Sequence, residues 1–353
     1  MFTLGNKQLC SSCFAAIKKE PCKKCGFTSD SYVPDKMALP TGSILMGNFL
    51  IGRVLGKGGF GITYLAYDVR YDHIIAIKEY FPVEIALRGA GETCLMVRDQ
   101  KSVELFRKGV EKFYNEASFI SEFSENPSIV RVYQLFYENN TAYFTMEYIS
   151  GITLKDYVSR VGTVTAEQAA YIADRVADAL VDVHAKNVLH RDVSPDNIML
   201  CGDGRVKLLD FGAARQVFPE GSQLLSVILK PGFAPLEQYM RSGKQGEWTD
   251  VYSLGASLYY ALTKQIPEDP QNRFEDDSVL ERNMNYIPPE LRGVITRAMA
   301  VRYTDRYRSS REFADVLAAV PIRRRPVKIP ANLSVHEDND SPIKRLIAKL
   351  FGN

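Results

Sequence analysis

The spacing of hydrophobic and polar residues changes several times along the chain and divides it into regions. Residues 1–29 are rich in Cys and Lys and have few apolar positions, so they predict a small module without a core of its own. Residues 30–43 hold two prolines and no periodic pattern, which is typical of a linker. From residue 44, two β-rich runs around a glycine-dense turn predict a hairpin, and HIIAIKEYF at 73–81 predicts another strand.

A helical period first appears after Ser102, which can cap a helix that runs to about Phe123. Two strands are predicted at 128–138 and 141–149, and the pattern is mainly helical over 151–320. A strand-rich region followed by a helical region predicts an α+β fold. The apolar residues that carry the first helical period are Val103, Phe106, Val110, Phe113, Ala117 and Ile120.

Composition limits the classes of function. Of the 353 residues, 46% are hydrophobic and 24% are charged, and the net charge is +2, as in an ordinary globular protein with a sizeable core. This balance gives no indication of nucleic-acid or membrane binding. No apolar run reaches the roughly 18 residues of a membrane span, and the first residues lack the order of a signal peptide. We therefore expect a protein of the reducing cytoplasm.

The glycine-dense turn carries the pattern G-x-G-x-x-G at Gly56, Gly58 and Gly61. Glycines let backbone N–H groups approach phosphate oxygens without interference from a Cβ. The pattern alone is weak, because glycine-rich hairpins are common. A dinucleotide-binding fingerprint would lead directly into a helix. The run after Gly61 is β-rich, so this loop joins two strands, as in a hairpin that covers phosphates.

Lys78 ends the apolar part of the predicted strand that follows the hairpin. A lysine in this place is often a surface residue with a buried stem. The functional interpretation places its ammonium on the α- and β-phosphates of a nucleotide, paired with a glutamate of the next helix. We prefer Glu116 to Glu111 and Glu122 for that role, because the sequence NPSIV follows Glu116 at a suitable distance.

The sequence HRDVSPDN, which begins at His190, fits the pattern H-R-D-x-x-x-x-N. In that pattern Asp192 accepts the proton of a substrate hydroxyl and Asn197 binds a metal ion. The alternative is a loop rich in Asp and Asn turns. Asp210 opens the sequence DFG after a strand-like run, where it can reach Mg²⁺ on the β- and γ-phosphates, although Asp beside Gly is also a common turn signal. Asn197 and Asp210 together offer the oxygen ligands that Mg²⁺ needs.

Residues 49–320 resemble a protein kinase domain of the bacterial, eukaryotic-like Ser/Thr family, because the glycine loop, lysine, helix glutamate, catalytic loop and DFG occur in this order. The resemblance implies a two-lobed kinase fold, with an N-lobe at 44–149 and a C-lobe at 150–320. It also implies that ATP, with Mg²⁺ or Mn²⁺, is used to phosphorylate Ser or Thr hydroxyls of protein substrates. A pseudokinase scaffold that binds nucleotide without turnover stays open as an alternative.

The same resemblance implies further roles for single residues. Asp250 is similar to the aspartate that braces the catalytic loop, and Arg306 is similar to the arginine that pairs with Glu237 of an A-P-E-like segment. At the adenine ring it implies a gatekeeper, a hinge and an apolar sandwich. The gatekeeper is Met146, the hinge is Glu147 to Ile149, and the sandwich is formed by Leu55, Thr63, Ala76 and Met199.

Ser194 departs from the family, which usually has a lysine there that touches the transferring phosphate. Serine cannot supply that charge, so Lys230 is a candidate for another cation near the γ-phosphate. The nucleotide lysine, both metal ligands and the proton acceptor are present, which favours an active enzyme. In the family, an arginine such as Arg191 often binds a phosphate on the activation loop, where Ser222 and Ser226 are available. A constitutively ordered loop is the alternative.

Cys10, Cys13, Cys22 and Cys25 form two C-x-x-C pairs, with eight residues between the pairs. Four thiolates at this spacing can converge on a structural Zn²⁺ ion, which would supply the folding energy that so short a segment lacks. Disulfides or a redox pair are the alternatives. We expect the linker at 30–43 to separate this zinc-ribbon-like module from the kinase core, so that the kinase survives loss of the metal.

Both ends of the chain are candidate docking sites. Lysines in residues 1–29 allow a nucleic-acid-binding regulator, although only Phe14 and Phe27 offer rings for stacking on bases. The basic tail at 321–353 is predicted to be extended before a short amphipathic helix that is capped at Ser341. That helix packs on its own lobe, binds a partner or lies weakly on a membrane surface. Its apolar stripe is Ile343, Leu346, Ile347, Leu350 and Phe351.

Overall fold

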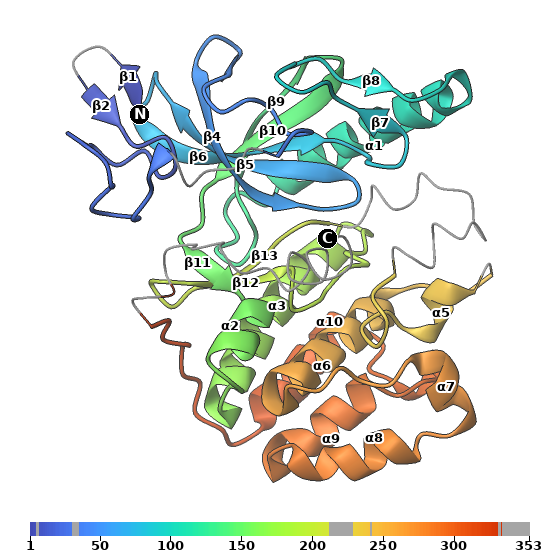
Figure 1. Cartoon of the computed structure of the whole chain (residues 1–353). Helices are drawn as coiled ribbons and strands as arrows, with labels where there is room; N and C mark the ends of the chain where they lie inside the picture. Colours follow the sequence, from blue (N-terminus) through green and yellow to red (C-terminus); the bar gives the residue numbers. More distant parts are fainter. Residues whose placement is uncertain (5–6, 30–34, 212–228, 241, 331–332, 334–353) are drawn as a thin grey trace, which may run out of the picture.

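The chain folds into two lobes, a strand-rich N-lobe and a helical C-lobe, with a small cysteine module on the N-lobe (Figure 1). This arrangement confirms the α+β class and the two lobes that the sequence predicts. The computed structural model describes residues 1–4, 7–29, 35–211, 229–240, 242–330 and 333.

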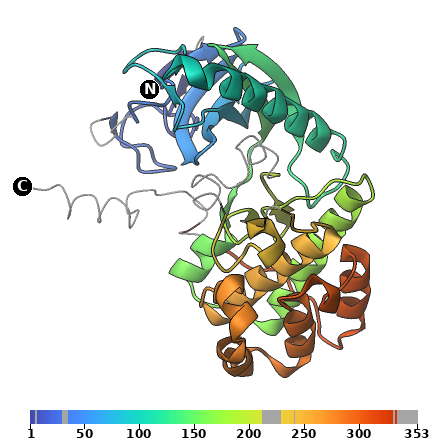
Figure 2. The ribbon, with the colours of Figure 1, turned by 90° about the vertical axis from the view of Figure 1, so that its right-hand side faces the viewer.

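The N-lobe is built on a six-stranded antiparallel sheet in the order β3-β4-β5-β6-β10-β9. The predicted hairpin and the strand after it form β4, β5 and β6. A long helix, α1 (Val103–Ser121), packs against β9 and β10 and runs along one side of the lobe (Figure 2). The strands are β3 (Ile44–Leu45), β4 (Phe49–Lys57), β5 (Gly61–Asp68), β6 (His73–Tyr80), β9 (Val132–Glu138) and β10 (Thr141–Glu147).

The chain enters α1 differently from the prediction. The region between β6 and α1, for which no element is predicted, contains a small hairpin of β7 (Ala86–Leu87) and β8 (Met96–Val97). Ser102 stands at the start of α1, but its side chain does not cap the helix. Asp99 instead caps the preceding 3₁₀ turn η2 (Gln100–Ser102), because its carboxylate accepts hydrogen bonds from the backbone and the hydroxyl of Ser102, both at 3.0 Å.

The core of the C-lobe lies between two long helices, α3 (Ala166–His184) and α6 (Glu247–Thr263). Thr165 and Gln168 form a capping box that starts α3. Most of α6 is buried, and small or apolar residues predominate in it from Val251 to Leu262. The other elements are β11 (Gly151–Thr153), β12 (Ile198–Cys201), β13 (Val206–Leu208), α2 (Leu154–Arg160), α5 (Leu236–Tyr239), α7 (Pro270–Glu275), α8 (Ser278–Asn283), η4 (Met284–Tyr286), α9 (Pro289–Ala298), η5 (Tyr303–Asp305) and α10 (Ser310–Ala319).

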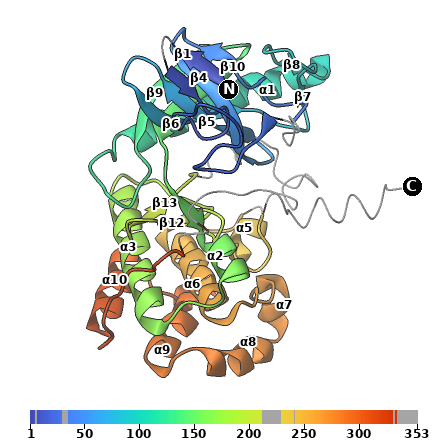
Figure 3. The same ribbon diagram turned by 60° about the vertical axis from the view of Figure 1, so that its left-hand side comes forward.

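The cysteine module packs directly on the N-lobe sheet, which contradicts the expectation of two separate cores (Figure 3). Phe14 of the module shares one hydrophobic cluster with Leu50, Leu65 and Tyr67 of β4 and β5, and its ring centroid lies 5.5 Å from that of Tyr67. A Cβ atom on Gly52 would lie 2.8 Å from the Phe14 ring. The ring therefore fills a space that only glycine leaves open.

Two short strands, β1 (Phe2–Leu4) and β2 (Lys7–Leu9), form the edge of the module. An ion pair joins them to the turn between β5 and β6, with Lys7 Nζ 2.8 Å from Asp72 Oδ1. The module is therefore attached to the N-lobe by polar as well as apolar contacts.

Residues 35–43, the described part of the predicted linker, also belong to the N-lobe. Leu39 is buried in the N-lobe core, and its backbone N–H donates to the Tyr64 hydroxyl at 3.0 Å. Asp35 forms an ion pair with Lys57 of the glycine-rich hairpin at 2.9 Å. This segment fixes the start of the hairpin instead of separating two cores.

Residues 321–330 are extended along the C-lobe, as predicted. Arg324 pairs with Asp174 of α3 at 2.9 Å, and Val327 is buried against the lobe. The predicted helix from Ser341 lies outside the described residues. Among the residues that the structure describes, no helix is both long and apolar enough to cross a membrane.

Candidate active site

The register of the N-lobe sheet brings the predicted nucleotide residues together. Gly56 on β4 pairs with Thr63 on β5, and Thr63 pairs with Lys78 on β6. Ala76, two residues before Lys78, pairs with Met146 on β10. Because side chains alternate along a strand and cross-strand partners share a face, these side chains lie on one face of the sheet.

The packing around the three loop glycines differs. A Cβ on Gly56 or Gly58 would meet nothing within 4 Å, so the fold alone does not explain glycine at these two positions. A Cβ on Gly61 would lie 2.5 Å from the carbonyl oxygen of Glu79 on the neighbouring strand. Gly61 is therefore required by the packing of β5 on β6, a reason that the phosphate argument had missed.

Lys78 reaches across the cleft between the lobes to Asp210, with Nζ 2.5 Å from Oδ1. Burial acts to lower the pKa of Lys78, but the charges of Asp210 and Glu116 outweigh it and raise that pKa. Burial likewise acts to raise the pKa of Asp210, and Lys78 outweighs it, so this pKa is lowered. The two groups therefore stay ionised together at neutral pH.

The structure distinguishes the three glutamates that were considered on α1. Glu116 is buried and acts on Lys78 through its charge. Glu111 pairs with Arg107 on the exposed surface at 2.5 Å, and Glu122, at the end of the helix, pairs with Lys186. Glu116 is the one of the three that faces the predicted site.

The catalytic loop is held by Asp250, as the resemblance implied. Its carboxylate accepts hydrogen bonds from the backbone N–H of His190 at 2.8 Å and of Arg191 at 2.7 Å, and contacts His184 Nε2 at 2.7 Å. Arg191 has a φ of +63°, which is costly for a side chain of this size. The buried carboxylate offsets that cost and fixes the loop.

Asp192 and Asn197 lie side by side within this loop. The amide Nδ2 of Asn197 donates to the carbonyl of Asp192 at 2.8 Å and to its Oδ2 at 2.7 Å. The ring of Phe211 packs on His190 with 4.5 Å between centroids, and His190 Nε2 lies 2.9 Å from the carbonyl of Leu209. These contacts join the catalytic loop to DFG.

The second implied pair is also present. Arg306 reaches Glu237 with Nη1 2.7 Å from Oε1, and the Arg306 side chain is fully buried. Thr249 donates its hydroxyl to the same carboxylate at 3.0 Å. Glu237 thus joins α5 both to Arg306, which follows η5, and to Thr249 of α6.

The hinge strand carries a contact that the sequence did not reveal. The Glu147 carboxylate accepts hydrogen bonds from Lys207 Nζ at 2.6 Å and from the N–H of Arg131 at 2.8 Å. Lys207 pairs in register with Met199 on β12, which places Met199 on the C-lobe side of the cleft. Ile149 lies just after β10 and packs on the main core. The hinge and the floor of the cleft are therefore tied together.

Sequence reasoning also missed a buried cluster beside Lys78. Glu79 is 0% exposed, and its carboxylate accepts hydrogen bonds from Tyr64 at 2.7 Å, from Tyr143 at 2.6 Å and from Arg88. Two adjacent charges in an apolar strand point to opposite faces, so one of them must enter the core. That rule would have indicated a buried partner for Glu79.

A family model described as "Protein kinase domain" matches residues 49–326. The chain belongs to the protein kinase family. A solved structure titled "PpkA-294 apo form" is 35% identical, covers 79% of this chain and 99% of that chain, and superposes with a TM-score of 0.71. The matched residues include Lys78, Asp192, Asn197 and Asp210.

Curated relatives match this kinase over most of its length. Serine/threonine-protein kinase PknA of Nostoc sp. is 28% identical, covering 78% of this chain and 47% of the relative. Serine/threonine-protein kinase PrkC of Bacillus subtilis is 27% identical, covering 85% of this chain and 44% of the relative. The chain spans about half the length of the curated relatives it matches.

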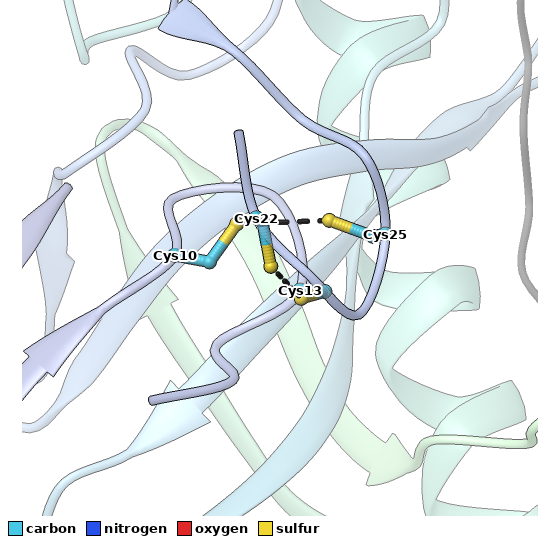
Figure 4. Close-up of side chains that lie close together, drawn as sticks. All are labelled: Cys10, Cys13, Cys22 and Cys25. Atoms are coloured by element: carbon cyan, nitrogen blue, oxygen red, sulfur yellow. Dashed lines mark hydrogen bonds between the residues drawn. The ribbon is translucent and has the colours of Figure 1, made fainter. Parts of the chain in front are cut away.

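The four cysteines of the module converge, as predicted (Figure 4). Their Sγ atoms all lie within 4.8 Å of one another, with 3.7 Å between Cys10 and Cys25 and between Cys13 and Cys22. Tetrahedral Zn–S bonds of about 2.3 Å require S–S separations of about 3.8 Å. The distances fit one shared ion, and the thiols are free rather than bonded in pairs.

The two C-x-x-C turns have the same backbone form. The N–H of Phe14 donates to the Cys10 carbonyl at 2.9 Å, and the N–H of Gly26 donates to the Cys22 carbonyl at 2.8 Å. Phe14 and Gly26 both have positive φ, +56° and +71°. This repetition orients both thiol pairs toward the same point.

Arg191, which the resemblance linked to a phosphate on the activation loop, has a partly buried side chain. Its Nε finds no hydrogen-bond partner within the described part of the kinase, and burial lowers its pKa. Ser222 and Ser226 lie outside the described residues, so their phosphorylation stays a prediction.

Proposed function

We propose that this chain is an active protein kinase that transfers the γ-phosphate of ATP to Ser or Thr hydroxyls of proteins. The observation that carries the proposal is the assembly of Lys78, Glu116, Asp192, Asn197 and Asp210 around one cleft. Lys78 and Asp210 keep each other ionised, and the amide of Asn197 holds the carboxylate of Asp192 in place. No group of this set is missing, and none points away from the others.

The chemistry follows from these positions. A substrate hydroxyl next to Asp192 gives its proton to the carboxylate while its oxygen bonds to the γ-phosphorus and the bond to the β-phosphate oxygen breaks. Lys78 leaves its ion pair with Asp210 to bind the α- and β-phosphates. Asp210 and Asn197 would hold Mg²⁺ or Mn²⁺, which neutralises phosphate charge when it is bound. The donor set fits that metal, because it offers carboxylate and amide oxygens.

The adenine ring would lie between the two lobes. Leu55, Thr63 and Ala76 would cover it from the N-lobe and Met199 from the C-lobe. We infer that the carbonyl of Glu147 and the backbone of Ile149 hydrogen bond to the base. The N–H of Glu147 already donates to the Arg131 carbonyl at 2.9 Å.

The test is incubation of the purified chain with labelled ATP, Mg²⁺ and a library of Ser- and Thr-containing peptides, followed by mapping of the phosphorylated residues. Asp192→Asn is the paired variant, because it removes proton acceptance and keeps the shape of the side chain. We expect turnover in the wild type that falls about 10²- to 10⁴-fold in Asp192→Asn. Nucleotide binding without turnover in the wild type would instead support the pseudokinase alternative.

We also propose that the cysteine module holds one structural Zn²⁺ ion and serves the kinase rather than nucleic acid. Phe14, one of two rings considered for stacking on bases, is buried against the N-lobe. The four thiols meet the distance requirement for zinc.

Elemental analysis of the purified chain tests the metal. We expect about one Zn²⁺ per chain, lost in a Cys10→Ser/Cys22→Ser variant. Cys94→Ser is the matched control, because Cys94 is exposed and lies outside the module. Zinc retained by the double variant would contradict the four-cysteine site.

A further inference from the structure

Lys230 lies just before Pro231 and extends its side chain into the catalytic loop. Its Nζ donates to the Ser194 hydroxyl at 2.7 Å and lies 3.4 Å from Asp192 Oδ1 and 3.6 Å from Asp196 Oδ2. Ser194 is 0% exposed, so its hydroxyl is held within the protein. Asp196 already has a closer cation, Lys155, at 2.9 Å. Neutralising Asp196 therefore does not account for Lys230.

The backbone of Lys230 is fixed by the C-lobe. Its carbonyl accepts hydrogen bonds from the N–H groups of Phe233 and Ala234, both at 3.0 Å. Gly232 has a φ of +80°, and a Cβ there would lie 2.4 Å from the carbonyl oxygen of Pro267. The turn at Lys230 can pack against Pro267 only with glycine at position 232. The position of the ammonium is thus set by tertiary contacts, unlike that of an exposed lysine.

The charge of Lys230 reaches both sides of the reaction centre. It lies near Asp192, the proposed proton acceptor, and it contributes with Lys78, the larger influence, to lowering the pKa of Asp210 against the effect of burial. Lys78 approaches from the N-lobe and Lys230 from the C-lobe. A hydroxyl at Asp192 would therefore receive the γ-phosphoryl group close to the ammonium of Lys230.

We propose that Lys230 is a catalytic residue of the proposed kinase reaction, whose ammonium, held by Ser194, binds the γ-phosphoryl group during transfer. The hydroxyl proton goes to Asp192, the oxygen–phosphorus bond forms, and the bond to the β-phosphate oxygen of ADP breaks. The ammonium of Lys230 neutralises the charge on the transferred group. Ser194 is a positioning residue, because its hydroxyl accepts the hydrogen bond that aims the ammonium.

The proposal rests on the proposed function, so its test measures both. We would determine kcat on the peptide library and the Kd of a non-hydrolysable ATP analogue with Mg²⁺, for the wild type, Asp192→Asn, Lys230→Met, Lys230→Arg, Lys230→Ser and Ser194→Ala. Lys244→Met is the control, because Lys244 is an exposed lysine further along the same segment. Thermal melting of each variant identifies any that are misfolded.

We expect Lys230→Met to lower kcat about 10²-fold or more while the Kd of the analogue changes little, and Lys230→Arg to keep more activity. The exchange variant Ser194→Lys/Lys230→Ser should recover at least about tenfold over Lys230→Ser alone, because the charge returns to the same place from the other partner. A purely structural lysine would shift melting and would not be rescued by that exchange.

Two results would overturn the proposal and are distinguishable. Full kcat in Lys230→Met, with a wild type whose turnover depends on Asp192, would remove the catalytic role of Lys230 alone. A wild type without turnover, with the analogue still bound, would remove the proposed function and this inference together.

Discussion

The catalytic cleft and the contact between the cysteine module and the N-lobe are held together by opposite kinds of interaction. In the cleft, Lys78 and Asp210 form an ion pair that is partly open to solvent, and Asp192 lies 3.4 Å from the ammonium of Lys230. At the module contact, Phe14 and Leu65 are buried apolar side chains. The cleft is a set of charges poised for a ligand, whereas the module contact is an extension of the hydrophobic core.

This difference predicts different consequences of mutation. Burial of apolar surface contributes to folding at about 25 cal/mol per Å², while a partly exposed ion pair contributes little. Substitutions in the cleft should therefore remove activity and leave stability nearly unchanged. Substitutions at the module contact should remove stability first. Leu55 and Tyr148 join the two regions, because both pack against the cluster that contains Phe14 and both lie near the proposed adenine site.

The largest effect is expected in the cleft. Lys78→Met removes the ammonium that we assign to the α- and β-phosphates, so kcat/KM should fall roughly 10³-fold. The free energy of unfolding should change by less than about 1 kcal/mol, because the ion pair with Asp210 is partly exposed. Peptide phosphorylation and urea unfolding measure the two quantities. A large loss of stability would show that the cleft also holds the lobes together.

The next effect belongs to the module contact. Phe14→Ala removes a buried ring and should lower the free energy of unfolding by about 3 kcal/mol, the lower end of the range for a buried phenylalanine. The control is Phe274→Ala, because Phe274 is 55% exposed in the C-lobe. If both variants unfold at the wild-type urea concentration, the module is an independent unit, as the linker in the sequence first indicated.

A smaller and more specific effect is expected at Gly52. The Cβ of Gly52→Ala would press on the Phe14 ring and displace the module, at a cost of about 1–3 kcal/mol. Affinity for the ATP analogue should fall by a few-fold, because Leu55 and Tyr148 lose part of their support. Gly293→Ala is the matched control, since a Cβ there meets nothing within 4 Å and alanine favours the helix α9. Unchanged nucleotide affinity in Gly52→Ala would separate the module from the adenine site.

The same comparison explains how much the sequence could predict. The cleft was predicted residue by residue, because its groups sit in short motifs whose spacing is fixed by one loop or one strand. Lys230 was suggested only because Ser194 stands where the family usually has a lysine. The docking of Phe14 on Gly52 was not predicted, because neither residue is unusual alone and the contact joins segments that no local pattern connects. Residues 35–43 were misread for the same reason: two prolines indicate a linker, but not what it packs against.

The smallest expected effect is the dependence of stability on pH at the Lys78–Asp210 pair. The pKa of Asp210 is lowered in the folded state, so its contribution is present above the ordinary carboxyl pKa of about 3.9 and is lost as pH falls through the folded value. The pKa of Lys78 is raised, so its contribution is present below about 10.4 and is lost as pH rises through the folded value.

The difference in unfolding free energy between the wild type and Asp210→Asn should therefore be constant near neutral pH and shrink below about pH 4. It should be small, because 45% of the Asp210 side chain is exposed and solvent screens the pair. Urea unfolding of both proteins at each pH measures it, and the subtraction cancels any acid-induced loss of zinc that the two share. A difference that persists undiminished at pH values well below 4 would show that Asp210 is held by its neutral hydrogen bonds and not by the charge of Lys78.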